Sequence, residues 1–271
     1  MKTRRAIYTL LLPLLFLLLS CDMEQEVEIK LPPYESQLVV ECYLEPGKSL
    51  RAVVLESVSY FNEPELPLVP DAEVFITHQG RTIKLPFSPI QNKATGKYYT
   101  HRKNEKLNLQ PGDVLTLEVK DKKGRHVTGT TTVMGQVPIE AVEWKFNESN
   151  KAYLLTSYQD DPDAANYYRY MVHRDSLSNS SQRDFVSSDQ LTNGQRVSYG
   201  SGYDYEEGDT LIVSLFHIEK QYYDFLSSIS DARRANGNPF AQPSRIVSSV
   251  KGGIGIFTNL SYNRKTVVIE K

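Results

Sequence analysis

Short runs of β-branched and aromatic residues, broken by turns that contain glycine or proline, set the main constraint on how this chain folds. Side chains in such runs alternate between the two faces of a strand, and Val74, Ile76 and His78 share one face in this way. Turn residues between two runs predict a β-hairpin. Three hairpins are expected, at residues 37–61 with the turn Glu-Pro-Gly-Lys, at 72–85 with Gln-Gly, and at 113–133 with Lys-Gly. No helical pattern interrupts residues 35–135, so these strands predict a sandwich of the immunoglobulin-like or carboxypeptidase-regulatory-like type.

The chain changes pattern near Gln136 to Pro138, where glycine and proline indicate a boundary between domains at 35–135 and 136–271. Strand-like runs continue after it, and a polar stretch at 176–209 predicts long exposed loops around one or two weak strands. One segment near 220–236 has the period of a helix, with these residues on one face: Tyr222, Phe225, Leu226, Ile229 and Ala232. Gly237 and Pro239 would end it, and burial of this face against a sheet is a better explanation than partner binding. The predicted fold is mainly β: an N-terminal immunoglobulin-like sandwich, then a second β-rich domain carrying one amphipathic helix.

The N-terminus has the order of a secretory signal: basic residues, an apolar run at 6–19, and a small residue. The apolar run is too short for a spanning helix, which needs about 20 residues. The stretch Leu18 to Cys21 resembles the bacterial lipobox, which implies that residues 1–20 are removed and that Cys21 carries acyl chains. Several acyl chains hold a protein stably, so we expect a lipoprotein anchored in a membrane without spanning it. The alternative is an ordinary signal peptide with an incidental cysteine.

Residues 21–34 form an acidic tether behind the expected lipid, with Asp22, Glu24, Glu26 and Glu28 and no apolar period. This arrangement resembles the surface-export signal of Bacteroidota lipoproteins. It implies an outer-membrane protein that faces the cell exterior. A merely soluble spacer fits the same composition.

Net charge argues against nucleic-acid binding, and cysteine content argues against a disulfide. Without residues 1–20 the chain has 28 Lys and Arg against 33 Asp and Glu, a net charge of −5, and no basic stripe that would bind nucleic acid. Cys42 is then the only thiol besides Cys21, so no intramolecular disulfide forms within the mature fold. We expect Cys42 to be a buried strand residue.

The sequence contains no catalytic signature, so we expect no enzyme, no cofactor and no metal site. Its five histidines are scattered singly, without the spacing of a zinc site, and no nucleophile elbow or phosphate loop occurs. The stretch QDDPDAAN at 159–166 offers oxygen atoms to calcium, but a turn explains it better. Glycines in VKGGIGIF at 250–257 indicate a bulge or tight packing against the preceding helix, rather than a ligand site.

Tyrosines are the candidate binding residues, because a flat ring with a hydroxyl suits contacts with sugars, peptides or proteins. Tyr199, Tyr203 and Tyr205 fall in the polar stretch, where we expect their rings to be partly exposed. The competing interpretation is ordinary strand packing.

Five segments occur in an order that resembles one family of Bacteroidota lipoproteins: the lipobox, LVVECYL at 38–44, VPDAEVFI at 69–76, YQDDPDAANYYRY at 158–170 and GNPFAQPSRIVSSVKGGIGIF at 237–257. It is the domain of unknown function numbered forty-two forty-nine, whose members are often encoded beside SusC-class TonB-dependent receptors. The resemblance implies a surface lipoprotein that is an accessory or ligand-binding partner of such a receptor in nutrient uptake. A structural or adhesive surface lipoprotein without a receptor is the first alternative, and a secreted hydrolase is the second.

Overall fold

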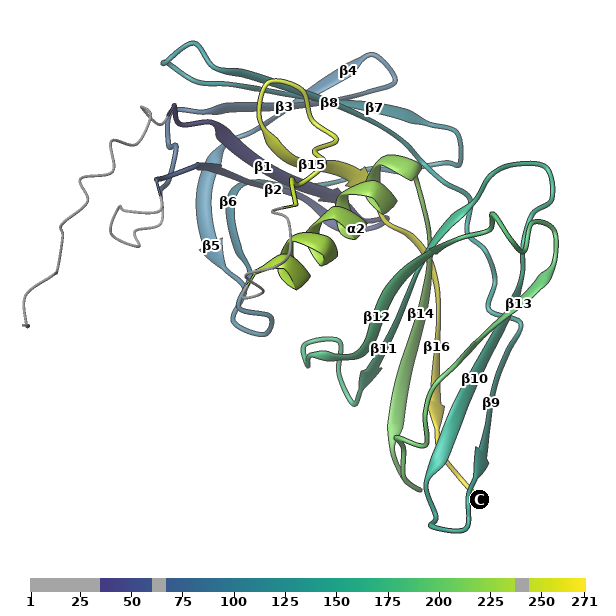
Figure 1. Ribbon diagram of the computed structural model, residues 1–271. Coiled ribbons are helices and arrows are strands. Elements are labelled where there is room, and N and C mark those ends of the chain that lie inside the picture. Colours follow the sequence, from purple (N-terminus) through teal and green to yellow (C-terminus); the bar gives the residue numbers. More distant parts are fainter. Residues whose placement is uncertain (1–34, 60–66, 237–243) are drawn as a thin grey trace, which may run out of the picture. The chain divides into compact units, whose positions relative to one another are not determined.

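The three expected hairpins are present in the computed structural model of the protein, which describes residues 35–59, 67–236 and 244–271 (Figure 1). They pair β1 (Leu38–Leu44) with β2 (Ser49–Glu56), β3 (Glu73–His78) with β4 (Arg81–Leu85), and β7 (Val114–Lys120) with β8 (His126–Thr132). Gln79 and Gly80 both have positive φ, at 49° and 77°, as the two-residue turn between β3 and β4 requires. The prediction of a mainly β fold is confirmed.

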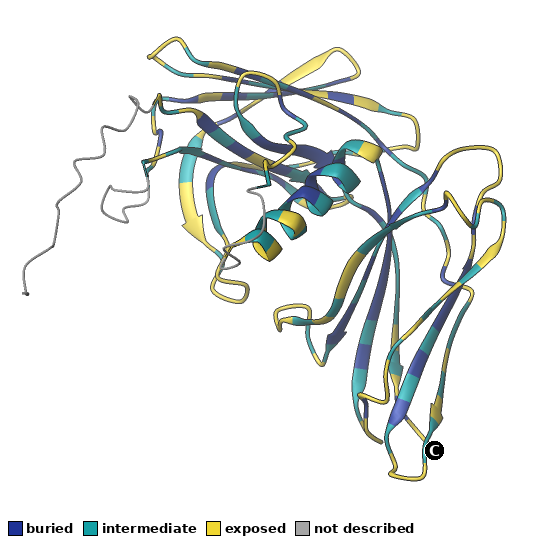
Figure 2. Ribbon diagram, viewed as in Figure 1, coloured by how far each residue is buried: buried dark blue, intermediate teal, exposed yellow. Residues whose placement is uncertain are grey.

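Two sheets enclose the first core. One has the strand order β15-β1-β2-β6-β5 and adds β5 (Phe87–Gln91), β6 (Tyr98–Lys106) and β15 (Ile254–Asn259); the other has the order β4-β3-β7-β8. Alternate residues of β1 point into the core between the sheets, and Cys42 is one of them, with no exposed surface. Burial raises the pKa of its thiol to about 12, so Cys42 is an uncharged core residue, as expected. Figure 2 shows this alternation as dark blue positions along the strands, with exposed residues in the turns.

Local sequence patterns did not predict that β15 would belong to the first sheet. It lies more than 200 residues after β1 and pairs parallel to it, with Val40 opposite Gly255 and Cys42 opposite Phe257. Glycine is required here because a Cβ atom on Gly255, whose φ is 132°, would lie 1.9 Å from the carbonyl oxygen of Val40. The glycines of VKGGIGIF therefore permit tight packing against β1, and not against the preceding helix as expected from sequence.

The second region also contains two sheets with a core between them. The first has the order β12-β11-β14-β16 and the second β13-β10-β9, with these bounds: β9 (Ala141–Phe146), β10 (Ala152–Gln159), β11 (Tyr167–Arg174), β12 (Ser181–Ser188), β13 (Arg196–Gly200), β14 (Thr210–Ile218) and β16 (Ser261–Val268). Strands β12 and β13 come from the polar stretch at 176–209. Tyr158, Tyr168 and Leu215 are among the buried residues of this core.

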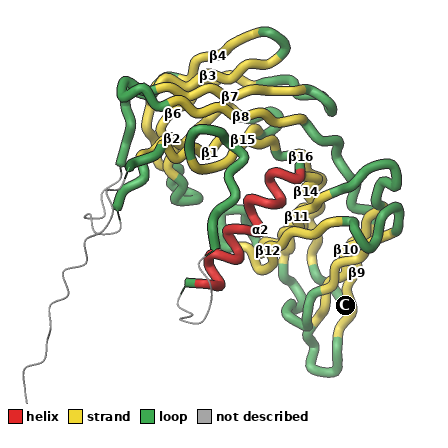
Figure 3. The backbone as a smooth tube through the Cα atoms, turned by 45° about the horizontal axis from the view of Figure 1, so that its top comes forward, coloured by secondary structure: helices red, strands yellow, loops and turns green. Residues whose placement is uncertain are grey.

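The expected amphipathic helix is confirmed as α2 (Lys220–Ala235). It contacts β11, β12 and β15 and lies beside them in Figure 3. Tyr222 and Phe225 are buried, and Leu226 and Ile229 pack partly buried beside them, so the predicted apolar face is the one that packs. The predicted stop signals Gly237 and Pro239 lie outside the described residues. No helix among the described residues is long and apolar enough to cross a membrane.

Polar contacts join the two regions where α2 begins. The carboxylate of Glu219 accepts hydrogen bonds from the backbone N–H of Thr132, at 2.8 Å, and from the hydroxyl of Thr131. Within the first region, Asn259 at the end of β15 donates to the Thr132 carbonyl of β8 at 2.6 Å, and it accepts from the N–H of Met134, just after β8, at 3.3 Å. Residues 36–271 accordingly belong to one compact unit.

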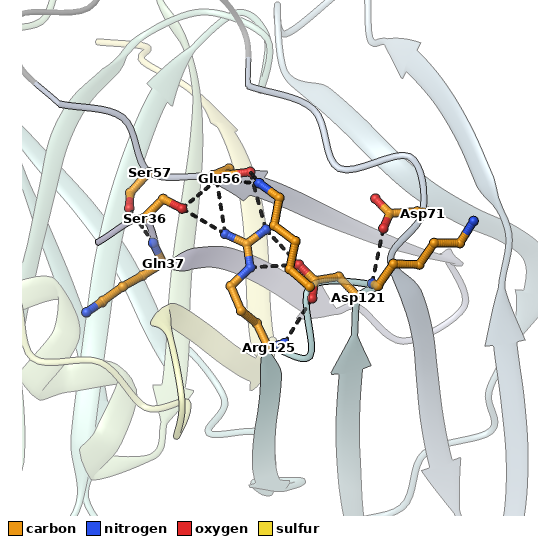
Figure 4. Close-up of polar contacts among 9 residues, drawn as sticks. Ser36, Gln37, Glu56, Ser57, Asp71, Asp121 and Arg125 are labelled. Atoms are coloured by element: carbon orange, nitrogen blue, oxygen red, sulfur yellow. Dashed lines mark hydrogen bonds and ion pairs between the residues drawn. The ribbon is translucent and has the colours of Figure 1, made fainter. Parts of the chain in front are cut away.

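A second polar cluster lies where the described chain begins (Figure 4). Glu56 accepts hydrogen bonds from Ser36 and from Lys123, and its carboxylate pairs with Arg125, which also binds Asp121. These donors lower the pKa of Glu56 to about 2. The cluster ties the residues before β1 to the end of β2 and to the turn between β7 and β8. The expected signal peptide, Cys21 and the acidic residues of the tether lie outside the described residues.

Candidate functional site: an aromatic groove beside helix α2

A groove of about 1060 Å³ lies between the outer faces of two sheets and one side of α2. Strands β1, β2 and β6 supply one wall, β11, β12, β14 and β16 supply another, and α2 closes a third side. Six tyrosine rings line it: Tyr43, Tyr98, Tyr99, Tyr222, Tyr223 and Tyr262. The groove therefore presents several flat aromatic faces to whatever enters it.

Strand alternation explains how the second region lines the groove while keeping its own core. In β11, Tyr168, Tyr170 and Val172 point into the core between β11 and β10. Arg169, Met171 and His173 lie on the opposite face and line the groove. A single strand thus serves both purposes with alternate residues.

Several rings in the groove are held by packing against another ring or by a hydrogen bond at the hydroxyl. Tyr43 lies 5.9 Å from Tyr222, and Tyr167 lies 5.0 Å from Tyr223, measured between ring centroids. The hydroxyl of Tyr262 donates to Glu45 at 2.9 Å. Such contacts hold the rings in one orientation before any ligand arrives, which lowers the entropic cost of binding.

Arg169 is the best-fixed charge in the groove. Its guanidinium donates to both carboxylate oxygens of Asp184, at 2.8 and 2.6 Å, and to the hydroxyl of Tyr222 at 2.8 Å. Burial acts to lower the pKa of Arg169, but the bonds to Asp184 and Tyr222 outweigh it and raise the pKa. Burial also raises the pKa of Tyr222, so the arginine stays charged and the phenol stays neutral.

His173 carries a buried polar atom without a partner. The residue is 7% exposed, and its Nδ1 makes no hydrogen bond to any described residue. Burial, followed by the charge of Arg264, lowers the pKa of His173, so the ring is neutral. An unpaired buried nitrogen costs about 1–3 kcal/mol, and a ligand or a water that bonded to it would recover part of that cost.

The other four histidines have structural partners. His101 accepts from the Thr100 hydroxyl and donates to the Ala72 carbonyl, and burial lowers its pKa. The remaining three each bond to an acid or to polar groups of loops: His78 to Asp113, His126 to Glu118, and His217 to Asn166 and the Gly135 carbonyl. Within the described residues, no three His, Cys, Asp or Glu side chains are grouped to hold a metal ion.

The QDDPDAAN stretch is a braced turn. Asp160 is buried and accepts hydrogen bonds from the Tyr168 hydroxyl at 2.5 Å and from the Gly194 N–H at 2.8 Å. Asp161 accepts from the N–H of Asp163 two residues later, and Asn166 donates to the carbonyls of Asp161 and Ala164. These bonds engage both carboxylate oxygens of Asp160 and one of Asp161, as in a turn stabilised by its own side chains.

The three tyrosines predicted as a contact surface do not share an environment. Tyr205 has no exposed surface and belongs to the second core, so its predicted exposure is wrong. Tyr199 is half-buried on β13, and its hydroxyl bonds to Tyr158 and Ser187. Only Tyr203 is exposed, at 48%, with its ring edge-on to Tyr153 at 5.5 Å. Sequence reasoning failed because a polar loop can pair with a distant strand and so bury one of its rings in the hydrophobic core.

The groove was not predicted, because its residues come from eight separate strands and helices. Tyr43 and Arg51 alternate with core residues in strands whose buried faces dominate the pattern. The one signal available was the odd placement of Arg, Tyr and Met on the supposedly solvent-facing side of otherwise regular strands. Flat apolar faces beside fixed charged donors and acceptors are the chemistry of a binding groove.

Comparisons with known proteins give one family. The family model described as "Domain of unknown function (DUF4249)" matches residues 24–266. A search of curated proteins finds no match. Among solved structures, a chain from "Cytokine receptor complex - Crystal form 1A" aligns at 9% identity and a TM-score of 0.27, over 68% of this chain and 86% of that one. This similarity is too low to assign a fold or a role. Because the family model covers most of the sequence, from the acidic tether to the last strand, the chain belongs to the family of the domain of unknown function DUF4249.

Proposed function

We propose that the protein is a lipid-anchored, outward-facing lipoprotein of the outer membrane. In this role it holds a nutrient ligand in the groove for a SusC-class TonB-dependent receptor. The groove is the observation that carries the proposal, because its volume of about 1060 Å³ is at the upper end of what small-molecule sites enclose, roughly 300–1,000 Å³.

The proposed location in the outer membrane is based on the sequence before the first strand. The lipobox-like stretch from Leu18 to Cys21 supplies an acyl attachment point, and the acidic tether that follows supports surface export. The receptor rests on the resemblance to lipoproteins that are often encoded beside SusC-class receptors. A protein held near such a receptor by lipid gains a high effective concentration, so a groove of modest affinity is sufficient.

The receptor part of the proposal is tested by purification. The full protein is extracted from outer membranes in detergent and isolated under mild conditions. An enriched TonB-dependent β-barrel is the expected result. Its absence would favour the structural or adhesive alternative.

The groove part is tested by growth on defined single nutrients. A deletion strain identifies the nutrients that need the protein, and complementation with Tyr223→Ala tests the groove. Tyr223 is half-buried on α2 and lines the groove, while the comparison variant Tyr203→Ala changes an exposed ring elsewhere. Tyr223→Ala should grow like the deletion and Tyr203→Ala like the wild type, at equal protein levels. Wild-type growth of Tyr223→Ala on each of these nutrients would contradict a role for the groove.

A further inference from the structure

Two arginines face each other across neighbouring strands of the first sheet. Arg51 of β2 lies directly opposite Arg102 of β6 in the antiparallel register. Like charges in this position destabilise a sheet. Neither arginine forms an ion pair with an acid among the described residues. The fold therefore keeps a repulsive pair that nothing in the described protein neutralises.

Neutral groups hold both guanidinium groups in place. The guanidinium carbon of Arg51 lies 4.6 Å from the centre of the Tyr99 ring, in a cation–π contact. Nε of Arg102 donates to the carbonyl and to the hydroxyl of Ser88, both at 3.1 Å. Neither contact uses the terminal nitrogens of these arginines. Those nitrogens can thus donate to a ligand without first breaking an internal bond.

The two arginines line a pocket of about 970 Å³. It lies beside the β5–β6 hairpin, whose strands are labelled in Figure 1. Lys48, Lys93 and Lys103 also line it, and no acidic residue does. Only Lys103 has an acidic partner outside the pocket, Glu105 at 3.2 Å. The whole chain has a net charge of −2, so this concentration of positive charge is local. A positive concavity attracts and retains anions.

We propose that this pocket binds a phosphate or sulfate ester group. A guanidinium fork matches two oxygen atoms of such a group, and two adjacent forks match its several oxygens and its charge. Asn104 lines the same pocket; its Oδ1 accepts from the Ser49 hydroxyl at 2.9 Å, so its amide N–H groups remain to donate to a further oxygen. Binding of the anion removes the repulsion between Arg51 and Arg102. The relief of this repulsion adds to the free energy of binding. The site is separate from the function proposed for the groove, although Arg51 lines both.

The test is calorimetric titration of the purified full protein at constant ionic strength. The soluble probes are inorganic phosphate and a sulfated disaccharide. Arg51→Gln and Arg102→Gln should each weaken binding about tenfold or more, since a hydrogen bond to a charged group is worth that much. The matched control Arg196→Gln makes the same charge change at an exposed arginine outside the pocket and should bind like the wild type.

A second measurement separates the pocket from general folding effects. Without ligand, Arg102→Gln should melt at the wild-type temperature or above it, because the substitution relieves the repulsive pair. A lower melting temperature would contradict the claim that the pair is uncompensated.

Vesicles distinguish the two sources of the anion. If the soluble probes bind and their binding depends on both arginines, the ligand is a soluble phosphate or sulfate ester. Binding confined to vesicles containing phosphatidylglycerol, again dependent on both arginines, assigns a lipid headgroup. The proposal is overturned if the wild type binds neither, or if the pocket variants lose no more affinity than Arg196→Gln.

Discussion

Tyr203 and Tyr205 lie two residues apart in the same polar loop, yet one is 48% exposed and the other is not exposed at all. The backbone of Tyr205 pairs with Ala152, in both directions, and this pairing turns its ring into the second core. The composition of the loop gives no reason to expect different burial for the two tyrosines. Their roles differ because a backbone bond to a distant strand selects which ring enters the core.

These two residues give a matched pair of substitutions. Tyr205→Ser removes a fully buried aromatic ring and should destabilise the protein by about 3–5 kcal/mol, which is a fall of roughly 10 °C in melting temperature. Tyr203→Ser should change stability by less than about 0.5 kcal/mol. Thermal unfolding followed by circular dichroism measures both. Equal effects of the two substitutions would contradict the burial of Tyr205.

Glu56 makes stability depend on pH in the acidic range. Hydrogen bonds from Ser36, Lys123 and Arg125 lower its pKa from 4.5 to about 2. A carboxyl with a depressed pKa in the folded state contributes stability above its unfolded pKa and loses it as pH falls through the folded value. Wild type should therefore be more stable than Glu56→Gln above about pH 5, with the difference shrinking between pH 4.5 and pH 2. Urea unfolding across this range measures it, and a difference that is constant with pH would refute the assignment.

At the scale of elements, the parallel pairing of β15 with β1 depends on close approach of two backbones. Hydrophobic alternation could identify Ile254–Asn259 as a strand, but its partner is decided by which neighbour it can approach. Gly253 and Gly255 admit the carbonyls of Leu38 and Val40 at distances that no side chain would allow. The same strand then extends into β16, so this pairing joins the two regions.

Gly255→Ala tests the approach. The added Cβ would meet the Val40 carbonyl oxygen at 1.9 Å, and a φ of 132° is unfavourable for alanine. We expect a loss of about 3 kcal/mol or more, or failure to fold. Gly135→Ala is the control, since nothing lies within 4 Å of its added Cβ. Chemical denaturation compares them, and a neutral Gly255→Ala would mean that β15 does not pair closely with β1.

At the scale of the whole molecule, the lipid anchor that we propose would decide where the groove and the basic pocket act. Cys21→Ser should release the protein from membranes into a soluble or unprocessed form, because acyl chains supply about 0.8 kcal/mol for each buried CH₂ group. Fractionation of cells and metabolic labelling with palmitate measure this. Normal processing and retention in the outer membrane would contradict lipidation.

The sequence by itself determined the hairpins, the buried position of Cys42 and the face of α2, because each depends on residues close together in the chain. It also led to the family through ordered motifs. Only the tertiary structure decided the partner of β15, the burial of Tyr205 and the residues of the groove and the basic pocket. Arg51 and Arg102, for example, are 51 positions apart in the sequence and meet through the register of β2 with β6. The period of hydrophobic residues shows which face of a strand is buried. Strand pairing and packing decide which residues become neighbours on the other face.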